Sequence, residues 1–322
     1  MTSRTVSLAA PAKVNLFLRV LDRRADGYHE LETLFQSVSL TDEVSVTLNE
    51  DVPAGVTPGS ELESGRGSST IRLQVEGADL GPAASNLAYR AAQRFVEETG
   101  LAATIDVTLV KNIPAGAGLG GGSSDAAAVL RCLADLTDVD DPDLLFLIGS
   151  ELGSDVAFFL AQSPTVLGKG RGEVLRELTP LPQTHLVLAL PPVHVSTVDA
   201  YGALASARAA LTGTPEGNRV LRPEPMLDLG GLELARALDD LAHNDFESVV
   251  APTHSEIGES IAGLRAAGAS PALLSGSGAA SFGVFPSEEA AEQAARELEQ
   301  RLGWPFLPVR TLERPTGIAR GQ

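Results

Sequence analysis

The chain has 322 residues, of which 43% are hydrophobic and 20% charged, and its formal net charge is −18. This length is enough for about two domains, whereas so acidic a chain lacks the basic surface of a general nucleic-acid binder. No apolar run reaches the ~18 residues of a membrane-spanning helix, and the N-terminus lacks the apolar stretch of a secretory signal. Cys132 is the only cysteine, which excludes an intrachain disulfide, and we expect a buried thiol in a cytoplasmic protein.

The first half of the chain predicts two long strands and then alternating strands and helices. Apolar and polar residues alternate over 5–22 and 30–48, with β-branched and aromatic enrichment. Residues 50–70 are rich in Gly, Ser, Pro and acid, which predicts a mobile hairpin loop. Further along, we expect strands at 70–77 and 103–110, helices at about Asn86–Thr99 and Ala126–Leu136, and a helix from Pro142 with Asp141 as its N-cap.

The pattern restarts at about residue 165. The second half predicts strands at 173–178, 185–190, 271–276, 280–285 and 306–312, helices at 197–210, 232–242, 254–267 and 287–302, and a surface loop at 212–230. Because strands and helices mix without a strict βαβ rhythm, the sequence predicts an α+β fold in two domains, residues 1–165 and 166–322.

Five glycines fall within the seven positions 116–122, between an expected strand and an expected helix. Glycine is costly to order, so such a cluster indicates that the backbone approaches something closely. "GAGLGG" matches the dinucleotide pattern G-x-G-x-x-G, but "KNIP" separates it from the strand and no strand follows; a Walker A loop also fails, because no Gly-Lys-Ser/Thr closes it. A tight turn would need fewer glycines. We favour a phosphate site at the start of the helix, where Ser123 and Ser124 could reach a phosphate or Mg²⁺.

Three stretches of the chain resemble the GHMP kinase superfamily. "PAGAGLGGGSSDAA" (114–127) is similar to the central nucleotide-binding motif, and "LLSGSGAASFGVF" (273–285) to the C-terminal glycine motif. "PAKVNLFLRVLDRRADGYHELETLFQSV" (11–38) resembles the N-terminal signature of one branch of the superfamily, whose substrate is CDP-methylerythritol. The resemblance implies a two-domain GHMP kinase architecture, with an N-terminal nucleotide domain like ribosomal protein S5, a ferredoxin-like C-terminal domain and the active site in the cleft.

The same resemblance implies a kinase that uses ATP and Mg²⁺ to phosphorylate the 2-hydroxyl of CDP-methylerythritol, in the non-mevalonate (methylerythritol phosphate) route to isoprenoids. It makes Lys13 the active-site lysine and Asp155 the carboxylate that accepts the proton of the hydroxyl. Such a reaction needs positioning and charge stabilisation more than covalent chemistry. The residues that it assigns to ATP are Pro114, Ala115, Gly116, Ala117, Gly118, Leu119, Gly120, Gly121, Gly122, Ser123 and Ser124.

For the other substrate, the resemblance assigns Asn15, Tyr28, His29, Thr197 and Tyr201. Tyr28 and Tyr201 would stack on the cytosine, and His29 would bind its polar edge. No metal ligand is assigned, since the glutamate that ligates Mg²⁺ in many members has no match here. We expect small-molecule partners only, no nucleic acid or membrane, and a monomer or weak homodimer.

Two alternatives stay open at this point. One is another GHMP kinase, for homoserine, mevalonate or galactose, against which the stretch Asp26–His29 argues. The other is a nucleotide-binding module without turnover, against which the presence of both Lys13 and Asp155 argues.

The choice of cations gives a further signal. The chain has 21 arginines but only three lysines, Lys13, Lys111 and Lys169, and each lies in or beside a motif. Base bias in the genome would explain the arginine excess but not the placement of the lysines. Because lysine is a compact point charge, we expect the lysines to mark sites that need one.

Overall fold

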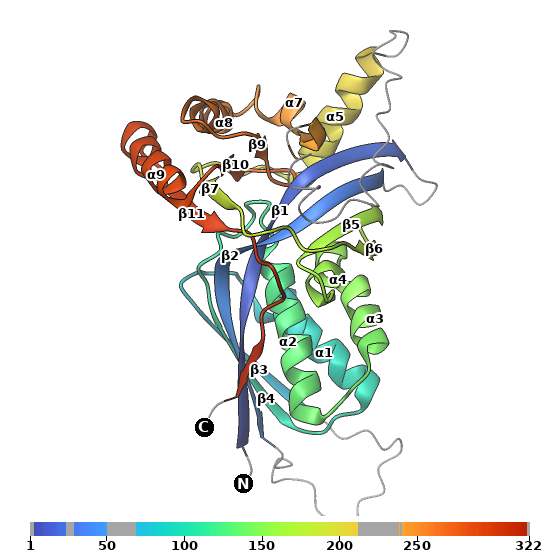
Figure 1. Cartoon of the computed structure of the whole chain (residues 1–322). Coiled ribbons are helices and arrows are strands. Elements are labelled where there is room, and N and C mark those ends of the chain that lie inside the picture. The colour runs from blue at the N-terminus through green and yellow to red at the C-terminus, as the bar shows by residue number, and fades with distance from the viewer. Residues whose placement is uncertain (1–2, 24–28, 50–68, 212–237, 239, 321–322) are drawn as a thin grey trace, which may run out of the picture.

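The computed structural model describes residues 3–23, 29–49, 69–211, 238 and 240–320 (Figure 1). They form two sheets with helices packed against each, in agreement with the expected mixture of strands and helices. The loop expected at 50–70 and the loop and helix expected over 212–242 lie largely outside the described residues. No helix in the described part of the chain is long and apolar enough to cross a membrane.

The first sheet is organised by two long antiparallel strands, β1 (Ser3–Arg23) and β2 (His29–Asn49), as the alternation predicted. On one side of this pair, β2 is followed by β4 (Thr104–Val110) and then by β3 (Thr70–Glu76). β3 and β4 are parallel, because the helix α1 (Leu87–Thr99) carries the chain back between them.

Later parts of the chain complete this sheet. β5 (Thr165–Gly170) pairs with β2 and with β6 (Val174–Glu177), while β8 (His243–Asn244) and β12 (Ile318–Arg320) pair with β1. These strands all lie at or beyond residue 165, so the sheets do not divide there. The division into two domains stays a prediction.

Helices cover one face of the first sheet (Figure 1). The central one, α2 (Gly121–Thr137), is buried along most of its length and contacts β1, β2 and α1. α1 buries Ala88, Ala91, Ala92 and Phe95, which share one helical face. Cys132 on α2 is buried, and burial raises the pKa of its thiol to about 12, so the thiol is structural as expected. The remaining helices on this side are η1 (Ala83–Ser85), α3 (Pro142–Leu152) and α4 (Ser154–Leu160).

The second sheet has the order β11-β7-β10-β9 and is antiparallel throughout. A strand, helices, two strands, a helix and a last strand follow one another in the chain, which is the ferredoxin-like arrangement expected for this half. Its strands are β7 (His185–Ala189), β9 (Ala272–Leu274), β10 (Ser281–Phe285) and β11 (Phe306–Arg310), and its helices are α5 (Thr197–Leu211), α7 (Glu247–Val250), α8 (Ser255–Ala266) and α9 (Glu288–Leu302).

Some local elements differ from those expected, and one expected cap is confirmed. α2 begins at Gly121 rather than Ala126, so part of the glycine cluster is the first turn of the helix. The helix α4 and the strand β5 were not expected from the sequence. Asp141 does cap α3, because its carboxylate accepts a hydrogen bond of 2.9 Å from the backbone N of Leu144.

Candidate active site

Two glycine-rich loops, one from each sheet, contact each other. The backbone N of Ala280 donates to the carbonyl of Ala117 (3.0 Å), and the Ser275 hydroxyl donates to the carbonyl of Gly118 (3.1 Å). Gly118 has φ +78°, and a Cβ there would lie 2.3 Å from the Ser275 carbonyl oxygen. Only glycine fits this close approach, so the loop between β9 and β10 fixes the loop before α2.

The loop before α2 is anchored in the core and open at its tip. Pro114, Ala115 and Gly116 are exposed, whereas Leu119 is 1% exposed and its carbonyl accepts a hydrogen bond of 2.9 Å from the Lys13 backbone N. Gly120 is the N-cap of α2 with φ +73°. The first backbone N–H groups of a helix have no partner within it, and they carry the positive end of the helix dipole. The expected phosphate site therefore has the backbone that an anion needs, at Gly121, Gly122 and Ser123.

Lys13 and Asp155 lie together beside these loops. The Lys13 Nζ is 3.6 Å from Asp155 Oδ2, and a Cβ on Gly276 of the second glycine loop would be 3.5 Å from the same Nζ. The lysine side chain is 5% exposed, but the Asp155 side chain, in the first turn of α4, is 34% exposed. A buried ammonium group thus lies next to a carboxylate that a ligand can reach.

Asn15 lies beneath Lys13 and is only 1% exposed. Its Oδ1 accepts a hydrogen bond of 2.6 Å from Lys13 Nζ, and its Nδ2 donates to the Thr33 hydroxyl at 2.7 Å. The Thr33 hydroxyl donates in turn to the Phe17 carbonyl. This geometry favours orientation of Lys13 as the role of Asn15, whereas the expected contact with the substrate stays a prediction.

Aromatic side chains gather near Asp155. The rings of His29 and Tyr201 are stacked, with centroids 5.3 Å apart and planes at 17°, and Phe246 meets Tyr201 edge-on at 4.9 Å. Burial and, secondly, the negative charge of Asp155 raise the pKa of Tyr201. The spacing of His29 and Tyr201 leaves no room for another ring between them, so a bound base would lie beside this pair.

Two further residues, Thr197 and Tyr28, were assigned to the second substrate. Thr197 opens α5, and its hydroxyl is 3.0 Å from that of Ser277 in the second glycine loop, which brings it to the site. Tyr28 lies outside the described residues, so its predicted stacking is untested.

Asn244 is a positioning residue that no sequence pattern indicated. It is 4% exposed, and its Nδ2 donates to the carbonyls of both Leu274 and Gly276 at 2.8 Å. Its Oδ1 accepts from the Phe246 backbone N. Since β8 pairs with β1, Asn244 ties the second glycine loop to the strand that carries Lys13.

The scarcity of lysine did point to a second feature. Lys111 Nζ contacts the carboxylates of Asp42 and Asp125, the latter at 2.5 Å, and all three side chains are buried. We call these three residues the Lys111 network. By contrast, Lys169 is 41% exposed and forms a cross-strand pair of 3.4 Å with Glu32.

Within the described residues, no metal site is made of protein ligands alone. The described residues contain no group of three or more His, Cys, Asp or Glu side chains that could hold an ion. Ser124 is 1% exposed, and its hydroxyl has no hydrogen-bond partner among the residues described. Mg²⁺ commonly binds through substrate phosphates and only one or two protein groups, so this donor set fits a Mg²⁺ ion that arrives with a nucleotide.

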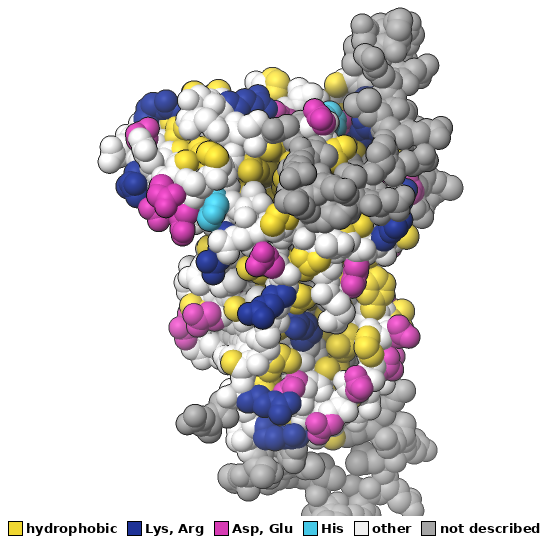
Figure 2. All heavy atoms as spheres, in the orientation of Figure 1, with side chains coloured by type: hydrophobic (Ala, Val, Ile, Leu, Met, Phe, Trp, Pro, Cys, Tyr) yellow, Lys and Arg dark blue, Asp and Glu magenta, His cyan; other side chains and the backbone are white. Residues whose placement is uncertain are grey.

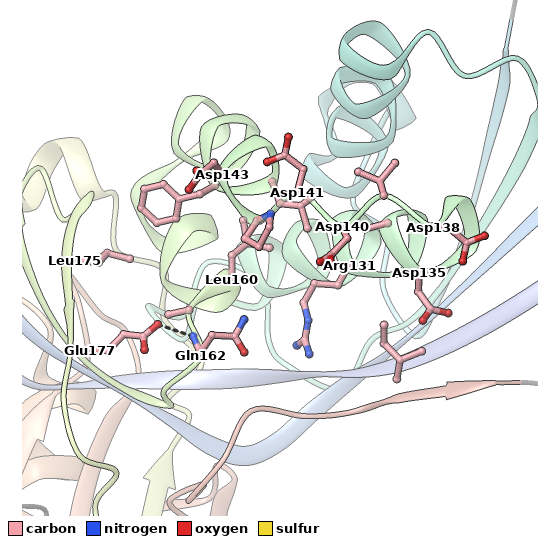
Figure 3. A pocket seen from close by; sticks show the side chains of 17 residues that line it. Arg131, Asp135, Asp138, Asp140, Asp141, Asp143, Leu160, Gln162, Leu175 and Glu177 are labelled. Carbon is pink, nitrogen blue, oxygen red and sulfur yellow. Dashed lines mark hydrogen bonds between the residues drawn. The ribbon is translucent and has the colours of Figure 1, made fainter.

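A cavity of about 620 Å³ lies away from the glycine loops, at the C-terminal end of α2, between α3, α4, β6 and β12 (Figure 3). Its acidic lining has structural partners. Asp135 pairs with Arg320 at 2.7 Å, Asp141 caps α3, and Glu177 accepts from the backbone N of Gln162. These contacts account, without a ligand, for three of the six acidic residues that line the cavity.

Figure 2 shows how charged side chains of the described residues are distributed over one face of the molecule. On the face drawn in Figure 2, basic and acidic side chains are interspersed and no continuous basic stripe is seen. This agrees with the net charge of −18.

Comparison with known proteins identifies the family. The model of the GHMP kinases N terminal domain matches residues 86–163, and that of the GHMP kinases C terminal domain matches 229–303. The chain is 39% identical to the 4-diphosphocytidyl-2-C-methyl-D-erythritol kinase of Geobacter metallireducens, over 96% of this chain and 99% of that one. It is 38% identical to the kinase of the same name from Heliobacterium modesticaldum, over 95% and 96%.

Solved structures agree with these relatives. A crystal structure of 4-(cytidine 5'-diphospho)-2C-methyl-D-erythritol kinase matches 95% of this chain and 98% of its own, with a TM-score of 0.73 and 34% identity. Homoserine kinase from Cytophaga hutchinsonii has a TM-score of 0.69 over 98% and 97% but only 20% identity, which shows the shared fold alone. The chain is therefore a GHMP kinase, a member of a family of ATP-dependent small-molecule kinases. Within that family it belongs to the 4-diphosphocytidyl-2-C-methyl-D-erythritol kinases, which confirms the resemblance and the fold class predicted from the sequence.

Proposed function

We propose that this protein transfers the γ-phosphoryl group of ATP to the 2-hydroxyl of 4-diphosphocytidyl-2-C-methyl-D-erythritol, a step of the methylerythritol phosphate route to isoprenoids. The names of its relatives support the substrate. The observation that carries the chemistry is the Lys13–Asp155 pair, 3.6 Å apart, at the junction of the two glycine loops.

ATP binds with its phosphates over residues 114–124. The exposed tip of this loop and the first turn of α2 offer backbone N–H groups and the positive end of a helix dipole. Ser124 completes the site. Its buried hydroxyl has no hydrogen-bond partner among the described residues, which suits a Mg²⁺ ion held mainly by the phosphates. When bound, Mg²⁺ supplies charge neutralisation on the transferring and leaving phosphates.

Asp155 is the general base, because its carboxylate is the ionisable group beside Lys13 that a substrate can reach. The 2-hydroxyl gives its proton to Asp155 as its oxygen bonds to the γ-phosphorus of ATP. The bond from that phosphorus to the bridging oxygen breaks, and ADP leaves. Lys13, held by Asn15, balances the negative charge that this transfer concentrates between the reactants.

The cytidine end of the substrate binds beside the His29–Tyr201 pair. Tyr201 of this pair lies close enough to Asp155 for the negative charge of Asp155 to raise the pKa of Tyr201. Thr197 and the second glycine loop border the same region. Tyr28, adjacent to His29 in the chain, is proposed to supply a second stacking ring. The polar edge of the His29 ring is proposed to select cytosine. The cytoplasmic location and the weak or absent dimerisation remain predictions.

An ADP-release assay across four alcohols tests the proposal. With the cytidine substrate, homoserine, mevalonate and galactose offered in turn, we expect turnover of the first alone. Preference for homoserine would move the protein to another branch of the superfamily, and no ADP release with any of them would favour a binding module. Asp155→Asn is the matched control, since a contaminating kinase would be unaffected by it.

A further inference from the structure

The Lys111 network joins the two ends of the nucleotide loop. Lys111 follows β4 and precedes the loop, Asp125 lies in the second turn of α2 after it, and Asp42 belongs to the neighbouring strand β2. The single ammonium group contacts both carboxylates. The side chains are 4% exposed for Lys111, 0% for Asp42 and 1% for Asp125.

Asp42 also holds the backbone where the loop begins. Its Oδ1 accepts hydrogen bonds from the backbone N of Asn112 (2.6 Å) and of Ile113 (2.8 Å). Packing joins the same places, because a Cβ on Gly121 would lie 2.9 Å from Ile113 Cγ2 and 3.4 Å from Asp42 Oδ2. The start of the loop and the start of α2 are thus fixed to one carboxylate.

This arrangement is costly if stability is its only use. Two carboxylates share one ammonium out of contact with water, and a buried ion network commonly stabilises no more than an apolar cluster of the same volume would. Asp125 Oδ1 has no hydrogen-bond partner within the described residues. Such groups are retained more readily where they fix one geometry.

Direct contact with the nucleotide does not explain the network either. Both side chains are buried, and when ionised they carry the same sign of charge as the phosphates. Any effect that they have on ATP must therefore pass through the backbone of the loop.

We propose that Asp42, Lys111 and Asp125 are positioning residues for ATP, which hold the two ends of the nucleotide loop so that its backbone is in the phosphate-binding conformation before ATP arrives. The inference rests on the proposed function, because it needs ATP to bind over residues 114–124. A preformed loop has little conformational entropy left to lose when the ligand binds. Loosening the network should accordingly weaken ATP binding and leave binding of the alcohol substrate unchanged.

The test compares three substitutions in the full-length protein. Asp125→Leu keeps the branched shape but removes the acceptor, Asp125→Asn keeps an acceptor for Lys111, and Asp106→Leu is a control on β4. Asp106 pairs with Asn49 and Arg72 at the surface, away from the loop. ADP and ATP affinities are measured by titration, and kcat and both KM values by ADP release.

We expect Asp125→Leu to weaken nucleotide binding about tenfold, which is the cost of ordering one additional flexible group when the ligand binds. The KM of the alcohol substrate should stay within about twofold of the wild-type value. Asp125→Asn should recover most of the affinity, and Asp106→Leu should match the wild type. A lower melting temperature in Asp125→Leu with unchanged nucleotide affinity would mean that the network only stabilises the fold, and the proposal would be wrong.

A measurement on the wild type covers the case in which Asp125→Leu does not fold. Hydrogen exchange of the Asn112 and Ile113 amides should be slow without nucleotide and change little when ADP is added. Fast exchange that becomes slow only with ADP would overturn the proposal. Gly120→Val distinguishes failure of the proposed function from failure of the network proposal. If Gly120→Val leaves ATP affinity intact, ATP does not bind here and the proposed function fails. If Gly120→Val abolishes binding while Asp125→Leu keeps it, only the network proposal fails.

Discussion

Lys13 and Lys111 are both nearly inaccessible, both lie at the base of the same glycine loop, and both contact carboxylates, yet their surroundings differ. Lys13 has one carboxylate partner, Asp155, whose side chain is 34% exposed. Lys111 has two, and neither is more than 1% exposed. A carboxylate that solvent reaches can also take a proton from a substrate, whereas a sealed one can act only through the backbone around it. Exposure of the partner, rather than the lysine itself, separates a reacting pair from a positioning one.

Removing the exposed carboxylate should have the largest effect on turnover. We expect Asp155→Asn to lower kcat by about 10²-fold or more, the usual contribution of a general base, with both KM values near those of the wild type. Lys13→Ala should also lower kcat. Because the two side chains contact each other, the double variant should lose less than the product of the single losses. Steady-state kinetics of the three variants decide this, and multiplicative losses would show that the two side chains act separately.

Gly120→Val should abolish ATP binding through the loop that both lysines support. Gly120 has φ +73°, and a Cβ there would lie 3.1 Å from Lys13 Cγ and from the Phe159 ring. Gly100→Val is a control for backbone strain alone, since Gly100 has φ +67° at the end of α1 and a Cβ there would meet nothing within 4 Å. Nucleotide titration of folded samples, checked by circular dichroism, should show loss in the first variant only. Equal losses in both would attribute the effect to strain.

The cytidine end of the site should respond independently of both lysines. We expect Tyr201→Ala, and equally Tyr28→Ala, to weaken binding of the cytidine substrate by about 1–3 kcal/mol, the contribution of one base stacked on an aromatic ring. ATP affinity should hardly change. Tyr89→Ala on α1 is the matched control, being the remaining tyrosine of the chain. If Tyr201→Ala weakened ATP binding instead, the aromatic pair would belong to the nucleotide side.

A uridine analogue of the substrate tests selection of the base more finely. Stacking tolerates any base, so discrimination must come from polar groups at the edge of the ring. A site that pairs such groups penalises an analogue that leaves them unpaired. We expect poor turnover of the uridine analogue, and equal kcat/KM for the two would remove His29 from the proposed recognition of cytosine.

The sequence predicted the features that are local in the chain. The alternation of β1 and β2, the cap of α3 and the glycine loop were all readable because each depends on neighbouring residues. Lys13 and Asp155 were found through motifs, although 142 positions separate them, and the structure brings them into contact.

Long-range partners without a motif were missed. Asp42 lies 69 residues from Lys111, and Asn244 lies 30 and 32 residues from the carbonyls that it holds. Nothing near either residue in the chain distinguishes it from a surface Asp or Asn. The short helix α4 was missed as well, because seven residues are too few to show a helical period.

The smallest expected effect concerns the charge of the sealed network. Burial raises the pKa of Asp125 from 3.8 to about 7, with the Asp42 charge adding to the rise and the attraction of Lys111 opposing it. Between pH 4 and 7 the folded protein therefore keeps a proton that the unfolded chain has released. The stability that this group contributes is fully present below pH 4, decreases as the pH rises to about 7 and is then constant.

Asp125→Asn removes that titration and keeps the shape of the side chain, so it isolates the effect. The difference in free energy of unfolding, wild type minus Asp125→Asn, should be more favourable to the wild type at pH 5 than at pH 8, by at most about 1.4 kcal/mol for each pH unit of the window. Urea unfolding of both proteins at the two pH values measures it, and titration of carboxylates outside the Lys111 network cancels in the difference. A difference that favoured the wild type more at pH 8 would mean that attraction to Lys111 outweighs burial. The Lys111 network would then stabilise the fold as an ordinary ion pair, and the contrast with the Lys13 pair would rest on exposure alone.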